Sequence, residues 1–336
     1  MKAMTIERHH STGPQLSMAE LARPVLGEGE VRVAVRAASV NRADLAQLAG
    51  THAPGEAASQ VQPVGLDAAG EIVEIGSGVT EFSCGDRVMA MAAGGLAEEV
   101  VVRAGMLIPI PANWSYFEGA AAVLGFMTAH NSLVTTAGLT THETVAVHAA
   151  TSGVGMQAVQ LARYFGAGHV IGTTRSGRGA DLLHDLGVDE VINTSSTDFA
   201  LRSLEFTGGK GVDVILDYVG GSYLPANIRA AALKGRIVGI GRLGGPEGTL
   251  DLEALAYKRL TISGVTFRTR NSDEKIEIVR ALRRDIASFQ TCTEDRDAHE
   301  SLRPIIAEIL PWNEVSYAYD LLSDNTLLGK IVMKVG

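Results

Sequence analysis

The chain has 336 residues, of which 46% are hydrophobic and 20% charged, and its formal net charge is −9. This length allows two domains with full cores, and the acidic balance argues against nucleic acid or an anionic membrane as the main partner. There is no apolar run long enough to span a membrane and no hydrophobic segment typical of a signal peptide. With only two cysteines, Cys84 and Cys292, we expect a cytoplasmic protein without a disulfide framework.

The first part of the chain, to about residue 121, is expected to be mostly β-structure. Valines alternate with polar or small residues in Glu30–Val40, which predicts a half-exposed strand. Shorter apolar runs recur at Glu71–Ile75, Arg87–Met91 and Glu98–Val102, with glycines between them. This punctuation favours a rolled, barrel-like domain.

Two helices are expected next. Ser115 and Glu118 have the spacing of a capping box, which predicts a helix start, and the apolar run continues to Val123. A second helix is predicted over Met127–Ala137, ending at Gly138.

The segment Thr144–Arg175 has the pattern of a dinucleotide-binding βαβ unit. A short β-branched strand precedes a turn of small residues, a mostly apolar helix and a second strand over His169–Thr174. Against the spacing G-x-G-x-x-G, the turn has Ala150, Ser152 and Gly155, so the bare pattern fails. A purely structural turn that packs the helix on the strand is the alternative interpretation.

The end of the second strand predicts which dinucleotide binds. An NAD-preferring unit has a carboxylate there that accepts a hydrogen bond from the ribose 2′-OH. This chain has Thr174 and Arg175, followed by Arg178, and no carboxylate occurs before Asp181. Guanidinium groups suit a 2′-phosphate, so we predict NADPH rather than NADH. The alternative is that both arginines are solvated loop charges.

Strands and helices then alternate in the manner of a doubly wound parallel sheet of about six strands. The expected strands are Glu190–Asn193, Val212–Leu216, Arg236–Ile240 and Leu260–Val265, and the expected helices are Asp181–Leu186, Phe199–Phe206 and Ala226–Leu233. The last part of the chain leaves this pattern. It should contain a helix over Asp273–Ile286, a polar loop over Cys292–Ser301, a helix over Glu314–Ser323 and a closing strand over Lys330–Val335.

Several motifs occur together and in order: Asn41–Leu45, Gly65–Gly70, His148–Gly155, Gly211–Asp217 and Leu328–Val332. With them, the chain resembles the medium-chain dehydrogenase/reductase superfamily in its zinc-free quinone oxidoreductase branch. The stretch Phe267–Arg270 is similar to the tumour-suppressor-inducible quinone oxidoreductase group. The resemblance implies an α/β protein with a GroES-like catalytic domain (1–121 and 268–336) and a Rossmann domain (122–267). It also implies a homodimer through Rossmann edge strands, for which Leu260–Val265 is the candidate.

The resemblance also predicts that no zinc is bound. Zinc members hold the catalytic ion at positions that here carry Asn41, Leu66 and Leu124; leucine cannot coordinate zinc, and asparagine is a poor ligand. Without a Lewis acid, hydride transfer to a conjugated acceptor is the natural chemistry.

The predicted site residues follow from the same resemblance. Asn41 is a candidate catalytic residue whose amide donates to an oxyanion or orients the coenzyme; alternatively, it only fixes a loop. Backbone amides of Ser152, Gly153 and Val154 are expected at the diphosphate, and Thr174, Arg175 and Arg178 at the 2′-phosphate. The remaining predicted coenzyme contacts are Thr128, Ile240, Leu243, Phe267 and Lys330.

The chain departs from its relatives at three positions. His52 stands where a tyrosine is common, and it is either a proton donor or an exposed loop residue. Gly179 replaces a coenzyme-binding lysine, and Thr194 replaces a tyrosine near the adenosine phosphate. Two other histidines, His148 and His169, are expected to pack at strand ends.

Three functions remain open from the sequence. The first is an NADPH-dependent quinone reductase. The second is an enoyl reductase acting on an α,β-unsaturated carbonyl or thioester. The third is an NADPH-binding protein with a structural, sensing or RNA-binding role, against which the acidic charge argues in the case of RNA.

Overall fold

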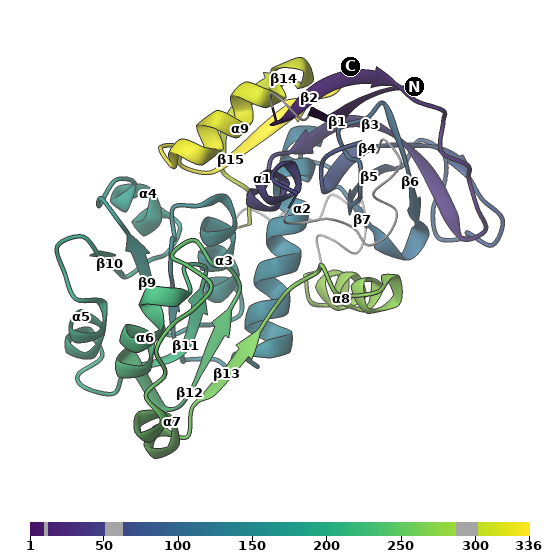
Figure 1. Cartoon of the computed structure of the whole chain (residues 1–336). Helices are drawn as coiled ribbons and strands as arrows, with labels where there is room; N and C mark the ends of the chain where they lie inside the picture. Colours follow the sequence, from purple (N-terminus) through teal and green to yellow (C-terminus); the bar gives the residue numbers. More distant parts are fainter. Residues whose placement is uncertain (10–12, 51–62, 287–301) are drawn as a thin grey trace. The chain divides into compact units, whose positions relative to one another are not determined.

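The computed structural model describes residues 1–9, 13–50, 63–286 and 302–336 (Figure 1). They form two compact units, one of Met1–Leu124 and Asp273–Gly336 and the other of Gly125–Ser272. The predicted domain boundaries at 122 and 267 lie a few residues before this division. Within the described part of the chain, no helix is long and apolar enough to cross a membrane.

The first unit contains a mixed sheet in the order β14-β15-β3-β4-β5-β7, with β6 paired to β3, and a β1–β2 hairpin. Its strands are β1 (Lys2–His9), β2 (Gly13–Glu20), β3 (Glu30–Ser39), β4 (Asp67–Ile75), β5 (Arg87–Met91), β6 (Glu99–Arg103), β7 (Leu107–Pro109), β14 (Ile306–Pro311) and β15 (Lys330–Lys334). Its helices are α1 (Arg42–Leu48), α8 (Ser272–Asp285) and α9 (Val315–Asp324), with 3₁₀ turns at Ala104–Met106 and Trp312–Glu314. The mixed sheet confirms the predicted β-rich fold, and this unit contains both ends of the chain.

Strand β3 organises this sheet because β4, β6 and β15 all pair with it. The prediction of a half-exposed strand is confirmed in part: Val31, Val33 and Val35 are buried, and on the opposite face Ala34 is half-buried and Arg36 exposed. Arg32, on the same face, differs because it is only 6% exposed. Its ion pairs with Glu74 and Glu99 hold it against the neighbouring strands.

The second unit contains a six-stranded sheet in the order β10-β9-β8-β11-β12-β13, and every neighbouring pair is parallel. Its strands are β8 (Thr144–Val147), β9 (His169–Thr174), β10 (Glu190–Asn193), β11 (Val212–Asp217), β12 (Ala231–Gly239) and β13 (Thr261–Gly264). Its helices are α3 (Gly153–Tyr164), α4 (Ala180–Asp185), α5 (Phe199–Phe206), α6 (Leu224–Ala230) and α7 (Leu252–Lys258), with a 3₁₀ turn at Gly221–Tyr223. The chain runs outward from β8 in both directions, so the topological switch point lies between β8 and β11.

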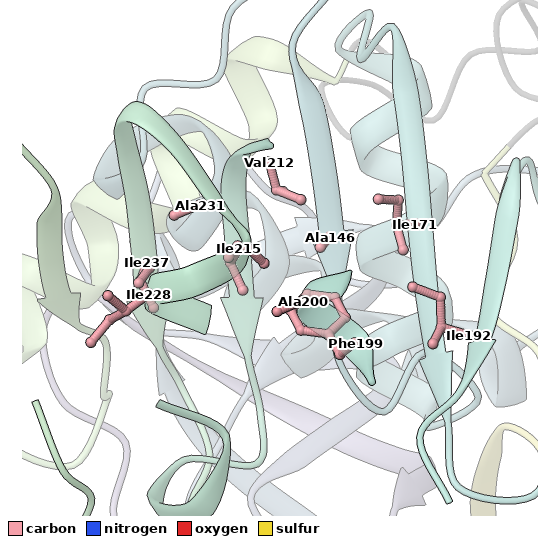
Figure 2. Close-up of a cluster of buried hydrophobic side chains, with 11 residues drawn as sticks. Ala146, Ile171, Ile192, Phe199, Ala200, Val212, Ile215, Ile228, Ala231 and Ile237 are labelled. Atoms are coloured by element: carbon pink, nitrogen blue, oxygen red, sulfur yellow. The ribbon is translucent and has the colours of Figure 1, made fainter. Parts of the chain in front are cut away.

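Apolar side chains on one face of this sheet hold α5 and α6 in place. Figure 2 shows Ile171, Ile215 and Ile237 from three of the strands with Phe199 and Ile228 from the two helices. All five are at most 4% exposed. This packing is the usual result of burying β-branched strand residues against helices and explains why the carboxyl ends of the strands stay aligned.

Two of the predictions about the elements needed correction. The two helices expected around 115–137 are one continuous element, α2 (Tyr116–His130) followed by a π-helical segment over Asn131–Thr136. The predicted capping box is present, since Ser115 Oγ accepts from Glu118 N at 3.2 Å. The helix predicted over Ala226–Leu233 ends at Ala230, because Ala231–Leu233 belong to β12. Sequence patterns also missed the β1–β2 hairpin, β14, α1 and α7.

Candidate functional site

A capping hydrogen bond and close backbone contacts fix the conformation of the turn between β8 and α3. Ala149 has a left-handed backbone conformation (φ 48°), and Ser152 Oγ caps α3 by accepting from Gly155 N at 3.1 Å. Gly155 is pressed against the turn, because an added Cβ would lie 2.4 Å from the Ala149 carbonyl oxygen. The close approach that the sequence pattern requires is therefore present.

The same turn offers backbone donors for an anion. Gly153 and Val154 are the first two residues of α3, so their N–H groups precede the intrahelical hydrogen bonds. The Ser152 N–H instead donates to Ala149 O at 2.9 Å. Of the three amides predicted to meet a diphosphate, two therefore remain suitable, at the positive end of a helix dipole.

The turn after β9 carries the residues predicted to select the coenzyme. Thr174 is 4% exposed, and its Oγ1 accepts from Gly177 N at 2.8 Å, so its hydroxyl shapes the turn. Arg175 and Arg178 are exposed, and neither forms an ion pair with any residue that the structure describes. Two guanidinium groups without a carboxylate partner fit a phosphate better than a ribose hydroxyl.

A second hydroxyl group reaches this turn from elsewhere in the sequence. Tyr223 donates from its phenol to Thr194 Oγ1 at 2.7 Å, and Thr194 donates to Thr174 O at 3.2 Å. Thr194 is the position at which the family resemblance predicts a tyrosine. Tyr223 therefore places a phenol beside Thr194, where the tyrosine expected from the resemblance is missing.

A buried polar network joins the ends of β8, β9 and β11. Asp217 Oδ1 accepts from Val219 N and Gly220 N, both at 2.8 Å, and Asp217 Oδ2 accepts from Asn227 Nδ2 at 2.9 Å. Asn227 Oδ1 lies 2.7 Å from His148 Nε2, and His148 Nδ1 lies 3.0 Å from Thr173 Oγ1.

The network also fixes which nitrogen of His148 carries the proton. Because Asn227 donates to Asp217, its oxygen must accept from His148 Nε2–H, and His148 Nδ1 accepts from Thr173. Burial lowers the pKa of His148, and the neighbouring charge of Asp217 opposes this shift only in part. His148 does pack at a strand end as predicted, with its ring against Phe199 at 4.5 Å, but its hydrogen bonds were missed.

The other coenzyme contacts predicted in this unit lie on three segments: the turns after β12 and β13, and α2. Ile240 and Leu243 follow β12, and the Ile240 N–H donates to Asp217 O at 2.8 Å. Ile240 and Phe267 are half-buried, whereas Leu243 is 53% exposed. Thr128 lies on α2 and is half-buried. Contact of these four side chains with a coenzyme stays a prediction.

The first unit holds Asn41 and Lys330 in a buried network. Lys330 Nζ donates to Asn41 Oδ1 at 2.6 Å and to Val40 O at 3.0 Å. Asn41 Nδ2 donates to Asp67 Oδ2 at 2.8 Å and to Ser39 O at 3.1 Å. Both amide hydrogens of Asn41 are thus engaged inside the unit, which favours a structural role over donation to an oxyanion.

Asp67 is the anionic centre of this network. Ser39 N and Ser39 Oγ each donate to one of its carboxylate oxygens at 2.5 Å, in addition to Asn41 Nδ2. Burial raises the pKa of Asp67 and lowers that of Lys330, and their mutual attraction opposes both shifts. Because only donors surround Asp67, it is held as an ionised carboxylate.

A second carboxyl group, Asp44, completes the cluster. Its Oδ2 accepts from Asn41 N at 2.7 Å, but its Oδ1 has no hydrogen-bond partner among the described residues, and neither has the buried Tyr319 hydroxyl. Burial, with the nearby charge of Asp67, raises the pKa of Asp44 to about 7. Sequence reasoning missed the roles of Asp44, Asp67 and Tyr319, which come together only when β4, β15 and α9 pack around α1.

Two of the predicted residues lie outside the part of the chain that the structure describes, namely His52 and Cys292. Within the described ranges, no group of three or more His, Cys, Asp or Glu side chains could hold a metal ion. The absence of zinc stays a prediction that rests on the side chains at positions 41, 66 and 124.

The chain matches two protein-family models: the alcohol dehydrogenase GroES-like domain over residues 27–112 and the zinc-binding dehydrogenase family over 153–283. Among curated proteins, it is 37% identical over 219 residues (65% of this chain) to the mycoketide-CoA synthase of Mycobacterium tuberculosis. It is 33% identical over 310 residues (92% of this chain) to the polyketide synthase GfsB of Streptomyces halstedii. The chain spans only 5% of the length of each of these relatives.

Solved structures are similar over the whole chain. An NAD-dependent alcohol dehydrogenase is 30% identical with a TM-score of 0.85, and all of each chain is covered. The mycobacterial protein Rv1454c complexed with NADPH is 26% identical with a TM-score of 0.83, over 99% of this chain and all of that one; a second structure of a mycobacterial protein is described as a quinone oxidoreductase. The JamJ enoyl reductase is 27% identical with a TM-score of 0.81, over the same shares of the two chains. The chain belongs to the medium-chain dehydrogenase/reductase superfamily, with likenesses to its quinone oxidoreductase branch.

Proposed function

We propose that this chain is an NADPH-dependent, zinc-independent reductase that delivers hydride to a conjugated carbonyl acceptor. The observation that carries the proposal is the arrangement of two turns at the carboxyl ends of β8 and β9 in the second sheet. There the two amides at the start of α3 lie one strand away from Arg175 and Arg178, which have no carboxylate partner among the described residues. This arrangement suits a diphosphate and a 2′-phosphate on the same molecule.

Each part of the chain has a defined task in this proposal. Gly153 and Val154 hold the diphosphate, Arg175 and Arg178 hold the 2′-phosphate, and Ile240, Leu243, Phe267 and Thr128 line the remaining coenzyme surface. NADPH, when bound, supplies the hydride. The residues at positions 66 and 124 are leucines, so the acceptor has to be activated by its own conjugation rather than by a Lewis acid.

Two acceptors are supported by different observations. A quinone is supported by the likeness to the mycobacterial quinone oxidoreductase. An enoyl thioester is supported by the similarity of this chain to polyketide synthases and to the JamJ enoyl reductase. Both acceptors are carbonyl compounds activated by conjugation, so the same site chemistry serves either.

The test is steady-state oxidation of NADPH with 1,4-benzoquinone, 9,10-phenanthrenequinone, a panel of enones and a crotonyl thioester. Product analysis separates a hydroquinone from a saturated thioester. We expect turnover with at least one conjugated acceptor, none with a saturated ketone, and no loss of activity after treatment with a chelator. Tight NADPH binding without turnover of any acceptor would support the non-enzymatic alternative instead.

We also propose a homodimer through β13. This edge strand pairs only with β12 among the described strands, and Ile262 on it is 42% exposed. Neighbouring α7 presents Leu252 and Tyr257, which are 67% and 76% exposed. An exposed edge strand beside apolar side chains is usually covered by another chain.

A further inference from the structure

Lys330 is a buried lysine whose charge needs an explanation. It is 5% exposed, whereas Lys334 at the other end of the same strand is exposed. A buried ammonium is stable only when acceptors and an opposite charge surround it. The acceptors are Asn41 Oδ1 at 2.6 Å and Val40 O at 3.0 Å, and the nearby charges are those of Asp67 and Asp44.

The ammonium and the carboxylate together determine how the Asn41 amide is oriented. With Oδ1 toward Lys330 and Nδ2 toward Asp67, each amide atom faces a partner of opposite polarity. The flipped amide would place its oxygen against the Asp67 carboxylate and its N–H groups against the ammonium. Only one orientation is compatible with both charges.

The same contacts connect four segments of the first unit. Lys330 begins β15, Asp67 begins β4, Ser39 ends β3, and Asn41 is the N-cap of α1. Asp67 also accepts from both the backbone and the hydroxyl of Ser39. The position of Asn41 therefore depends on a cation and a carboxylate that its amide bridges and that are far apart in the sequence.

We propose that Lys330 and Asp67 are positioning residues that fix Asn41 and the start of α1, and that Lys330 is not a direct ligand of the coenzyme. The consequence for catalysis rests on the proposed function and on the expectation that Asn41 is a catalytic or coenzyme-orienting residue. Lys330 thus acts as an internal cation beside Asn41. Position 41 is one of the three at which zinc members of the superfamily hold their metal.

The electrostatic part is tested without turnover, by a double-mutant cycle on thermal unfolding with Lys330→Met, Asp67→Asn and the double variant. Lys330→Met leaves two buried carboxyl groups without a cation and should lower the melting temperature by about 10 °C. The double variant should melt above Lys330→Met, because the unpaired charge of Asp67 is also removed. Lys334→Met is the matched control and should stay within about 2 °C of the wild type. Additive effects in the double variant would overturn the proposal.

The positioning part is tested at a temperature at which all variants are folded, by measuring NADPH affinity and kcat separately. We expect Lys330→Met to keep the Kd for NADPH within about threefold, while kcat falls at least about tenfold because the reacting groups are misplaced. A direct ligand would behave in the opposite way, with a Kd raised about tenfold or more and an unchanged kcat. That result would overturn the proposal.

The two measurements separate this inference from the proposed function. If the wild type reduces none of the acceptors, the proposed function fails, whereas the thermal cycle and the NADPH titration still give their answers for Lys330 and Asp67. If the wild type turns over and the cycle is additive, only this inference fails.

Discussion

His148 and Asn227 lie 79 residues apart in the sequence, yet His148 Nε2 and Asn227 Oδ1 are 2.7 Å apart in the buried interior of the second unit. Through Asn227 the ring is connected to Asp217, and through its other nitrogen to Thr173. The ends of three strands are therefore held by one chain of hydrogen bonds. These are the strand ends from which the turns that we propose to bind the coenzyme leave the sheet.

The first prediction concerns this network. His148→Phe keeps an aromatic ring against Phe199 and Tyr223 but leaves Asn227 Oδ1 and Thr173 Oγ1 without their partner. We expect a loss of about 2–3 kcal/mol in the free energy of unfolding, measured by urea denaturation, because buried polar atoms would be unsatisfied. His169→Phe is the control, since that side chain is 60% exposed and its loss should be near zero. Equal losses in the two variants would contradict the role given to the network.

The sequence was sufficient for the second unit and only partly so for the first. Parallel strands, buried on both faces, appear as short β-branched runs between glycines, so most elements from Thr144 to Val265 could be predicted; α7 and the boundary between α6 and β12 are the exceptions. The antiparallel hairpin at the N-terminus and strand β14 lack such runs. Polar residues interrupt their apolar ones, as Glu308 does in β14, and pairing partners rather than local pattern make them strands.

Some features of the candidate site could likewise be predicted from the sequence and others could not. A turn of small residues and two arginines are local patterns, and both could be identified from the sequence. Asp67 and Lys330 are 263 residues apart in the sequence, and folding of β4 and β15 brings both to Asn41. No spacing rule connects such residues, so the engagement of both Asn41 amide hydrogens could not be foreseen.

The second prediction concerns coenzyme preference. Arg175→Ala and Arg178→Ala should each raise the Kd for NADPH by about tenfold, because each removes a charged donor to the 2′-phosphate. The Kd for NADH should stay within about twofold, since that coenzyme has no phosphate there. Fluorescence titration measures both constants. Arg229→Ala, which removes an exposed arginine already paired with Asp198, is the control. Equal affinity of the wild type for the two coenzymes would contradict the assignment.

The third prediction concerns pH. The pKa of Asp44 is raised from an ordinary value of 3.8 to about 7, so the folded protein keeps a proton that the unfolded chain releases. The stabilising contribution of this proton is fully present below pH 3.8 and is lost as the pH rises through about 7. Asp44→Asn keeps an acceptor for Asn41 N without the charge. Relative to the wild type, this variant should therefore gain stability progressively as the pH rises over that range.

Denaturation curves of both proteins at about pH 5 and about pH 8 measure the gain, and the difference between the variants should be larger at the higher pH. Asp181→Asn, at an exposed position of α4, should show the same difference at both pH values. Parallel pH profiles for Asp44→Asn and the wild type would contradict a protonated Asp44.

The fourth prediction concerns the turn before α3. Gly155→Ala places a Cβ 2.4 Å from the Ala149 carbonyl oxygen and 2.9 Å from Ala150 Cα, so the turn has to shift. We expect a loss of about 1–3 kcal/mol of stability and a Kd for NADPH raised at least about tenfold, because the amides of Gly153 and Val154 move with the turn. Gly264→Ala is the matched control, since nothing lies within 4 Å of an added Cβ there. Unchanged NADPH affinity in Gly155→Ala would show that the turn does not hold the diphosphate.

The fifth prediction concerns the proposed dimer. Light scattering should give the wild type twice the 35.3 kDa mass of one chain. Ile262→Lys places a charge on the solvent-facing side of β13, and a buried unpaired charge at an interface of two edge strands should shift the protein to monomers. The matched control is Ile309→Lys, because Ile309 is 47% exposed on β14, which is the edge strand of the other sheet. A dimer that survives Ile262→Lys but dissociates with Ile309→Lys would move the interface to the first unit. A wild-type monomer would mean that Leu252, Tyr257 and Ile262 stay exposed to solvent.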